Sequence, residues 1–405
     1  MNLEYSAEYE QFRAEVRRFL AEHWSAEDAA RQPDPDGMAA MAGAPTLDER
    51  ATAFRRAAIE RGYLYRHVPR RYGGSEQPPD PLKATIIAAE FRRARAPHEI
   101  MGQGPSMLVP TLLEHGSEEQ KQRFIRDTLV GRIRWCQGYS EPGAGSDLAS
   151  LRTRAVLEGD YWLVNGQKIW TSGAKEADWM FALVRTDPDK PKHDGISYLL
   201  IEMKTPGIDV RPLRQMTGDA DFNEVFFENV RVPAANIVGR RGQGWIVSRS
   251  TLKHERALIG GSHLTRRAFD GLVMLARALE VRGRPAIADP VIRGRLIEIE
   301  ARLLANEYQS HRLLTMSARG EEPGLAGMVM KLASTQLSYD IAKLAMDVSG
   351  DKALLAPGES AAPAMGMFGS AYMWSLGVLI AGGAANIQRN IIAERGLGLP
   401  RDGKK

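Results

Sequence analysis

Cysteine is almost absent from this sequence, which contains Cys136 and no other thiol among 405 residues. One cysteine excludes an intramolecular disulfide and any metal site that needs several thiolates. No set of His, Asp and Glu has the spacing of metal ligands, so we expect no bound metal. The amino terminus, MNLEYSAEYEQFRAEV, is charged and lacks the apolar core of a signal peptide. These absences favour a protein of the reducing cytoplasm.

Long apolar runs and blocks of one charge sign are missing as well. The longest nearly unbroken apolar run, GVLIAGGAANI at 377–387, is too short and too rich in glycine for a bilayer, so we expect no membrane span. The 54 Lys and Arg residues and the 50 Asp and Glu residues are spread along the chain, which gives nucleic-acid binding no support. An ordinary soluble globular protein remains, and its length predicts two or three packed units.

The first region of the chain, residues 1–131, is predicted to be an all-α domain. Phe12, Val16 and Phe19 recur at helical spacing, which puts them on one face of a helix over 6–24. The segment PDPDGMAAMAGAPT at 33–46 has the composition of a flexible connector. Further helices are expected at 51–61, 82–95, 104–115 and 118–130.

The secondary structure that the sequence predicts changes twice after residue 131. Between 132 and 236, short β-rich runs punctuated by Gly, Asn, Asp and Pro predict a middle antiparallel β domain. Helical periodicity then returns and predicts a bundle of four long helices over 237–405, with helical stretches at 244–282, 289–318, 326–349 and 370–395. The expected fold class is α+β, in the order helical, β and helical.

Four blocks of sequence carry a family resemblance. The loop GYSEPGAGSD at 138–147 has glycines that let bare backbone approach a large ligand. With VNGQKIWTSGA at 164–174, FNEVFFENVRVPAANIVG at 222–239 and NIQRNIIAERGLGLPR at 386–401, it closely resembles the acyl-CoA dehydrogenase family. One glycine-rich loop would be weak evidence, whereas four blocks in family order over nearly the whole chain are specific. The resemblance implies an enzyme that binds FAD and acts on an acyl-CoA.

The resemblance also implies which residues hold the flavin ring. In the first block, the Ser140 hydroxyl, the backbone at Tyr139 and neighbouring Gln137 match flavin contacts of the family. In the second block, Trp170 matches a tryptophan that lies along the ring, and Ser172 matches a hydroxyl that points at N5. The alternatives are a core aromatic for Trp170 and a turn hydroxyl for Ser140.

Other matched positions concern the substrate and a neighbouring subunit. Ser146 matches a residue that contacts the acyl-CoA. In the family an arginine from a neighbouring subunit grips the adenosine end of FAD, and Arg282 or Arg284 has that position; the alternative is a solvated charge at a helix end. Asn386 matches a small polar contact near the end of the chain. The resemblance therefore implies an oligomer, either a homotetramer or dimer or a hetero-oligomer with a related subunit.

The catalytic base is not where many family members carry it. Their C-terminal glutamate aligns with Gly382, which cannot take a proton. Another branch holds the base on the first long helix of the third region, just before an arginine, and here Glu255 precedes Arg256, a matching substrate contact. The alternative is an exposed Glu–Arg helix pair. His254 is not the expected base, because adjacent helix positions face about 100° apart.

Three further departures leave alternative functions open. Ala384, Leu376 and Asp347 stand where the family commonly has threonine, arginine and glutamine. The leading hypothesis is an FAD-dependent acyl-CoA dehydrogenase that passes electrons to an electron-transferring flavoprotein. The departures allow a catalytically silent subunit that completes a partner's flavin site. A third hypothesis is a flavin oxidase or monooxygenase on the same fold, against which Glu255 argues mildly.

Overall fold

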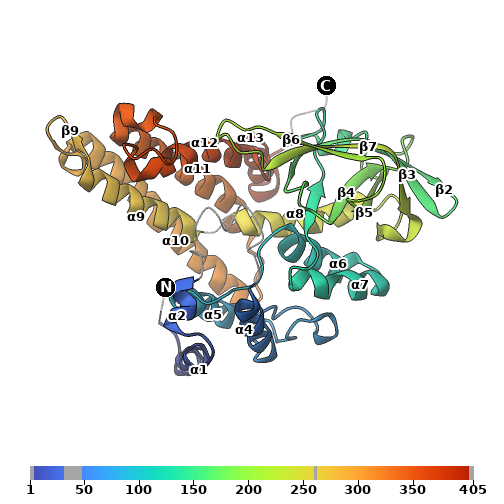
Figure 1. Cartoon of the computed structure of the whole chain (residues 1–405), viewed down its shortest axis with the longest axis horizontal. Coiled ribbons are helices and arrows are strands. Elements are labelled where there is room, and N and C mark those ends of the chain that lie inside the picture. Colours follow the sequence, from blue (N-terminus) through green and yellow to red (C-terminus); the bar gives the residue numbers. More distant parts are fainter. Residues whose placement is uncertain (1–3, 32–47, 260–261, 401–405) are drawn as a thin grey trace. The chain divides into compact units, whose positions relative to one another are not determined.

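The computed structural model describes residues 4–31, 48–259 and 262–400, and the side chains of 255–264 lie outside that description. The chain forms two compact units, Met1–Glu255 and Arg256–Lys405, and Figure 1 shows the elements of both. The predicted connector at 33–46 lies outside the described residues. The predicted domain boundaries at 131 and 236 stay predictions.

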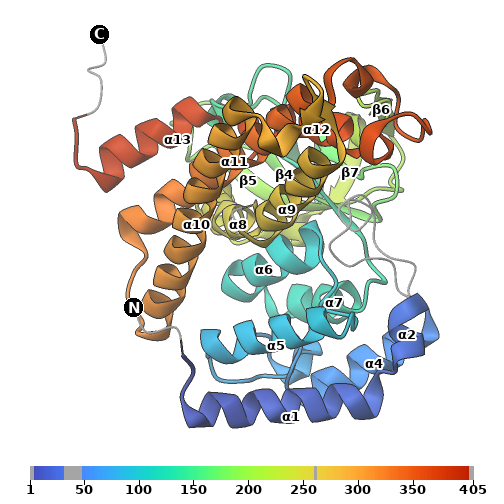
Figure 2. The ribbon, with the colours of Figure 1, turned by 90° about the vertical axis from the view of Figure 1, so that its left-hand side faces the viewer.

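The first unit begins with helices that confirm the predicted all-α region. Side-chain caps start several of them: Asp48 accepts a hydrogen bond from Ala51 N, and Ser117 and Gln120 form a reciprocal capping box. Aromatic rings, Phe54 and Phe91 among them, fill the core between α1, α4 and α5. The helices are α1 (Ala7–His23), α2 (Ala26–Arg31), α4 (Glu49–Glu60), α5 (Pro81–Arg93), α6 (Val109–His115) and α7 (Glu118–Leu129), drawn in blue to cyan in Figure 2.

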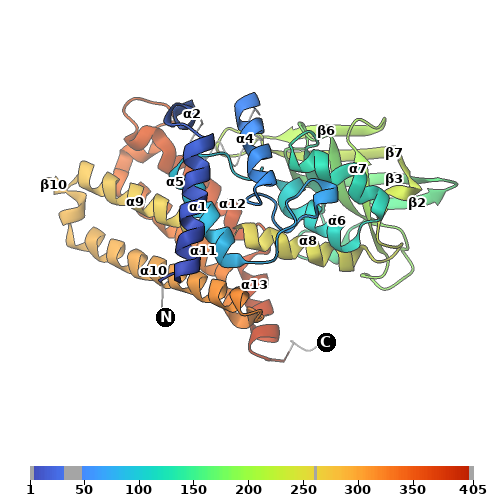
Figure 3. The same ribbon diagram turned by 90° about the horizontal axis from the view of Figure 1, so that it is seen from below.

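A twisted sheet follows and confirms the predicted β domain. The strand order is β6-β7-β3-β2-β4-β5-β8, and Figure 3 shows β6, β7, β3 and β2 side by side. Most pairs are antiparallel, but β1 runs parallel to β4, and β2 meets β4 in parallel at Arg154 and Arg185. The strands are β1 (Trp135–Gly138), β2 (Arg154–Glu158), β3 (Tyr161–Ser172), β4 (Trp179–Arg185), β5 (Ile196–Glu202), β6 (Ile208–Leu213), β7 (Phe222–Pro233) and β8 (Ile237–Val238).

The central strands β4 and β5 are buried on both faces, which explains their nearly continuous apolar sequences. Phe181 and Tyr198 point to the core shared with the N-terminal helices, while Met180 and Leu199 point to a second core on the other face. Helix α8 (Gly244–Ile259) joins the first core through Val247. The sheet therefore packs against the N-terminal helices on one face and closes a core among its own strands on the other, and β1 leads directly from it into the glycine-rich loop.

The second unit is helical, as predicted, and its core contains Leu272, Leu303 and Leu337. The predicted helix over 244–282 is confirmed within α8 and α9, which lie on either side of residues 260 and 261, themselves outside the described residues, and it is wrong at its end, where a hairpin of β9 and β10 follows α9. The predicted helix over 370–395 is interrupted at 381–384, where Gly382 and Gly383 have positive φ. The elements are α9 (Ser262–Ala278), β9 (Glu280–Val281), β10 (Arg284–Pro285), α10 (Pro290–Ala318), α11 (Gly324–Ser349), α12 (Met367–Ile380) and α13 (Ala385–Ile391).

By length and composition alone, the C-terminal stretch Pro363–Gly396 is long and apolar enough to cross a membrane. The mean hydropathy of its most apolar part is 1.4, and 11% of that part is buried. It is not one continuous helix, because the backbone breaks at 381–384. Its longest helix, α12, has 14 residues. Such a helix is about 21 Å long, shorter than the ~30 Å hydrocarbon core of a bilayer. The exposed apolar surface of α12 therefore needs another explanation.

Candidate active site

The first two predicted flavin blocks lie side by side in the sheet. Strand β1 ends at Gly138, and the chain then turns so that Ile169 N donates a 2.9 Å hydrogen bond to Ser140 O. A tight turn follows, closed by backbone hydrogen bonds in both directions between Glu141 and Ala144. The structure thus brings Ser140 next to the strand that carries Trp170 and Ser172, although Ser140 and Ile169 are 29 residues apart in sequence.

Trp170 is exposed to solvent rather than buried. It sits at an irregularity in the pairing of β3 with β7, between Lys168 and Thr171, and has a φ of +60°. This left-handed conformation is uncommon for a bulky residue and marks a position that the surrounding structure holds in place. The Trp170 side chain is 60% exposed and meets Phe222 edge-on, with ring centroids 6.1 Å apart. It is therefore not a core aromatic of this unit, and its exposed surface is open to a flat ligand.

The hydroxyl groups beside Trp170 fit a flavin ring. Ser140 and Ser172 are half-buried, and neither hydroxyl makes a hydrogen bond to another residue of the described chain. The Thr171 hydroxyl is buried and also lacks a partner there. A Cβ at Gly143 would meet nothing within 4 Å, so the loop borders open space. An aromatic surface with uncommitted hydroxyls suits an isoalloxazine ring, which needs donors along its polar edge.

The other predicted contact residues of these blocks differ in how far they are buried. The Tyr139 side chain is 4% exposed and packs edge-on against Phe181 and Tyr198, so its ring faces the core rather than a ligand. Gln137 lies in β1, opposite Phe181 of β4, and is half-buried. Ser146 is exposed in the loop, one residue before Asp147, whose carboxylate is 3.0 Å from Lys192 Nζ.

Helix α8, which carries the predicted base, is seated firmly on the first unit. Thr251 is fully buried, and its hydroxyl lies 3.0 Å from the Thr111 hydroxyl of α6 and 3.4 Å from the Tyr198 hydroxyl of β5. Glu255 follows one turn later as the last residue of this unit, and Arg256 is the first residue of the next. The side chains of Glu255 and Arg256 lie outside the described residues, so their predicted roles stay predictions.

A second set of contacts joins α8 to α6 around Glu114. Its carboxylate accepts a hydrogen bond from the Ser250 hydroxyl and lies 3.5 Å from His254 Nε2 and 3.6 Å from His115 Nε2. Burial alone would raise the pKa of Glu114, but the Ser250 hydrogen bond and the nearby imidazoles of His254 and His115 outweigh it and lower the pKa. The His254 imidazole thus points to α6, as expected for a residue that is not the base.

In the second unit, Arg282 and Gly283 form the tip of the β9–β10 hairpin. Both have positive φ, as in a two-residue hairpin turn. The Arg282 side chain is 75% exposed; its guanidinium lies 3.6 Å from Asp289, and that of Arg284 lies 3.4 Å from the same carboxylate. Burial would raise the pKa of Asp289, but two backbone hydrogen bonds and the two arginines lower it. Arg282 is therefore at a hairpin tip rather than a helix end.

The positions that depart from the family pattern have their own contacts. Gly382 and Gly383 form a loop whose carbonyl at Gly383 accepts a 2.9 Å hydrogen bond from Lys331 Nζ, and Lys331 is 3% exposed. Sequence reasoning missed this buried lysine, because it lies 52 residues before the loop. Asp347 lies 2.6 Å from Arg295, which neutralises its charge. Asn386 accepts a 3.3 Å hydrogen bond from Arg389.

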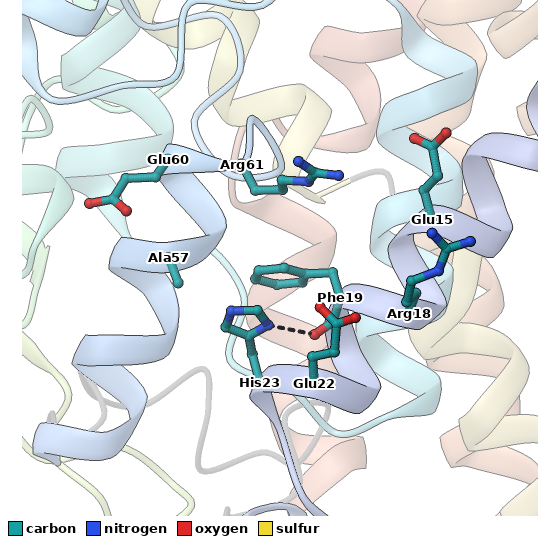
Figure 4. A pocket seen from close by; sticks show the side chains of 8 residues that line it. All are labelled: Glu15, Arg18, Phe19, Glu22, His23, Ala57, Glu60 and Arg61. Atoms are coloured by element: carbon teal, nitrogen blue, oxygen red, sulfur yellow. Dashed lines mark hydrogen bonds between the residues drawn. The ribbon is translucent and has the colours of Figure 1, made fainter.

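One hollow on the first unit does not belong to this site. It has a volume of about 500 Å³ and lies between α1 and α4, and Figure 4 shows the mixed charges around it. The lining includes none of the predicted site residues and is formed by Glu15, Arg18, Phe19, Glu22, His23, Ala57, Glu60 and Arg61. Within the described ranges no cluster of His, Cys, Asp or Glu could hold a metal ion.

The chain has a helical region, then a β domain and then a helical unit. The β domain offers an aromatic surface with free hydroxyls, and this combination is typical of a flavin-binding enzyme. Sequence models of the acyl-CoA dehydrogenase N-terminal, middle and C-terminal domains match residues 6–132, 136–230 and 242–397. Acyl-CoA dehydrogenase IpdE1 of Mycobacterium tuberculosis (strain ATCC 25618 / H37Rv) is 40% identical over 404 residues, 98% of this chain and 99% of the relative.

Two solved structures agree with these matches. The steroid ACAD Tcur3481-Tcur3483 has a TM-score of 0.77 at 28% identity and covers 99% of this chain and 100% of its own. The ChsE4-ChsE5 complex from Mycobacterium tuberculosis has a TM-score of 0.76 at 29% identity, with the same coverage. The chain therefore belongs to the acyl-CoA dehydrogenase family, and it is an oxidoreductase.

Proposed function

We propose that this protein catalyses FAD-dependent α,β-desaturation of an acyl-CoA thioester. The observation that carries the proposal is the adjacency of Ser140 to the strand with the exposed Trp170 and with Ser172. When bound, FAD supplies an acceptor for the hydride that leaves Cβ. The family blocks indicate that Trp170 supports the ring, while Ser140, Ser172 and the main chain at Tyr139 bind its polar edge, with Gln137 nearby.

Proton removal is assigned to Glu255. The α-proton of a thioester is weakly acidic, so a carboxylate in water is a poor base for it. Burial among apolar groups and substrate raises a carboxyl pKa toward the working range. We assign Arg256 and Ser146 to substrate binding, because both match family positions. Backbone N–H groups that polarise the thioester carbonyl would stabilise the enolate-like charge as it develops.

The substrate is proposed to be a bulky acyl-CoA. One of the similar structures is described as a steroid ACAD, and this chain shares 28% of its sequence over nearly its full length. We therefore favour a polycyclic or branched acyl group over a straight chain, and an electron-transferring flavoprotein as the electron acceptor. We also propose the reducing cytoplasm as the compartment, because the one cysteine, Cys136, is free and fully buried.

The assembly is proposed to be a symmetric tetramer or dimer, either of this chain alone or with a related subunit. Arg282 at its hairpin tip and Asn386 near the C terminus would reach a neighbour's FAD, as in the family. The exposed apolar residues around α12, including Met367 and Ile380, would be covered by other subunits. The similar ChsE4-ChsE5 structure is a complex of two named chains, which favours a hetero-oligomer.

A second candidate follows from Gly382, Ala384 and Leu376: a silent subunit that completes a partner's flavin site. The two candidates differ in what the purified chain does with FAD. We expect the chain, alone or with its partner subunit, to form an oligomer that retains non-covalent FAD. Light scattering with absorption at the flavin bands is the measurement. A flavin-loaded, active monomer contradicts the assembly, and colourless chain that gains FAD and activity only with a partner establishes the silent subunit.

A further inference from the structure

A buried ion pair joins the two flavin blocks, 138–147 and 164–174. Lys168 is fully buried and Glu141 is 9% exposed, and Lys168 Nζ lies 2.8 Å from Glu141 Oε1. Glu141 directly follows Ser140, and Lys168 stands two residues before Trp170 and four before Ser172. The family assignment gives neither residue a role in this chain. A buried ion pair is weak evidence for stability, because apolar residues of similar volume often serve as well.

The pair joins three segments of backbone. Lys168 Nζ also donates to Tyr139 O at 3.2 Å, which ties the first flavin block to β3. The Glu141 carboxylate accepts hydrogen bonds from Arg152 N at 2.6 Å and Thr153 N at 2.9 Å, at the start of β2. The carboxylate therefore has partners on both oxygens, and the loop, β2 and β3 are fixed to one another around it.

The electrostatics keep the pair charged. Burial lowers the pKa of Lys168 to about 8, while the Glu141 charge and hydrogen bond oppose that fall, and Arg185 adds to it. Burial would raise the pKa of Glu141, but Lys168 and the hydrogen bonds at Thr153 and Arg152 outweigh it and lower the pKa. Near neutral pH both groups are ionised, so the ammonium and carboxylate hold each other without water between them.

We propose that Lys168 and Glu141 are positioning residues for the flavin, which set the Ser140 hydroxyl at a fixed place relative to Trp170 and Ser172. The inference rests on the proposed function. Neither residue needs to touch the flavin: each acts through the backbone that carries a contact residue. A few tenths of an ångström at Ser140 or Trp170 changes a hydrogen bond or a ring contact, so the pair is expected to control both flavin affinity and the flavin environment.

The test replaces the pair without leaving a buried charge. The double variant Lys168→Met with Glu141→Gln keeps side-chain length and one carbonyl acceptor, and it is compared with Lys168→Met alone. Both are expected to raise the FAD dissociation constant by about ten-fold or more and to change the visible circular dichroism of bound flavin. The double variant, with no unpaired charge, guards against simple failure to fold. Flavin fluorescence titration and circular dichroism are the measurements, on the chain or complex that binds FAD in the wild type.

The matched control is Arg17→Met, which breaks another pair with a buried carboxylate. Arg17 donates to Glu90 at 2.8 Å and 3.0 Å, and Glu90 is 4% exposed, but neither belongs to a flavin block. This variant is expected to melt earlier while it keeps FAD affinity within about two-fold. If the Lys168 variants also bind FAD within two-fold, with an unchanged dichroism, the inference is wrong. Wild-type protein that takes up no FAD with or without a partner overturns the proposed function as well.

Discussion

Replacing Glu255 with glutamine is expected to leave FAD and acyl-CoA binding nearly normal and to slow flavin reduction by about 100- to 10,000-fold. The substitution keeps the size of the side chain and removes its basic lone pair. A loss of this size corresponds to roughly 3–5 kcal/mol of barrier. The measurement is stopped-flow bleaching of the flavin after mixing with substrate.

The matched control for this variant is Glu158→Gln, the same chemical change at an exposed position of β2. Its flavin reduction is expected to match the wild type. Adding Gly382→Glu to the Glu255 variant tests the family's other base position, and partial recovery is expected. The positive φ of Gly382, +60°, makes a side chain there costly by about 1–2 kcal/mol, so recovery is not complete. Reduction by Glu255→Gln within a few-fold of wild type would show that Glu255 is not the base.

The second large effect is expected at Gly244, where α8 begins against the sheet. A Cβ at this position would lie 2.4 Å from the Ser197 carbonyl carbon and 2.6 Å from its Cα, and neither backbone atom can move aside easily. A 3.0 Å hydrogen bond from Gly242 N to Ser197 Oγ also holds the start of α8 close to β5. Gly244→Ala is expected to lower the free energy of unfolding by about 2–3 kcal/mol, because overpacking shifts the helix.

This loss is measured by chemical or thermal unfolding of the FAD-free protein. Gly294→Ala is the control, since Gly294 lies inside α10 and a Cβ there would meet nothing within 4 Å. Alanine is the better helix former, so this variant is expected to gain about 0.5–1 kcal/mol. If Gly244→Ala unfolds like the wild type, α8 is not seated on β5 as described, and the account of what holds the helix with Glu255 fails.

The order of helices and strands could be predicted because the apolar spacing of each element depends on residues close together in the sequence. The spacing of Phe12, Val16 and Phe19 predicts the helix that the structure shows as α1. The nearly continuous apolar sequences of β4 and β5 are typical of strands buried on both faces. The short hairpin of β9 and β10 was missed, and β9 lies where a helix was predicted. The prediction also continued the helix to residue 282, past the end of α9 at Ala278, because helical periodicity alone does not show where a helix ends.

The candidate site was only partly predictable for a different reason. The family blocks named Ser140, Trp170 and Ser172, but sequence order did not show that Ile169 pairs with Ser140 or that Trp170 is exposed. The Lys168–Glu141 pair spans 27 positions, and only the fold brings it together. A charged residue inside a strand pattern was the available signal: Lys168 falls on the same alternation along β3 as the buried Trp162 and Val164, where an apolar side chain is expected.

Acyl-CoA desaturation by a flavin held at the 138–147 and 164–174 blocks is the central claim, and anaerobic bleaching tests it most directly. FAD-loaded protein, with its partner subunit if one is needed, is mixed with a panel of straight-chain, branched and polycyclic acyl-CoAs. The expected result is loss of the oxidised flavin absorption with one equivalent of α,β-unsaturated thioester formed, fastest with the bulky acyl groups. Protein that binds FAD but keeps its oxidised spectrum with every acyl-CoA would contradict the claim.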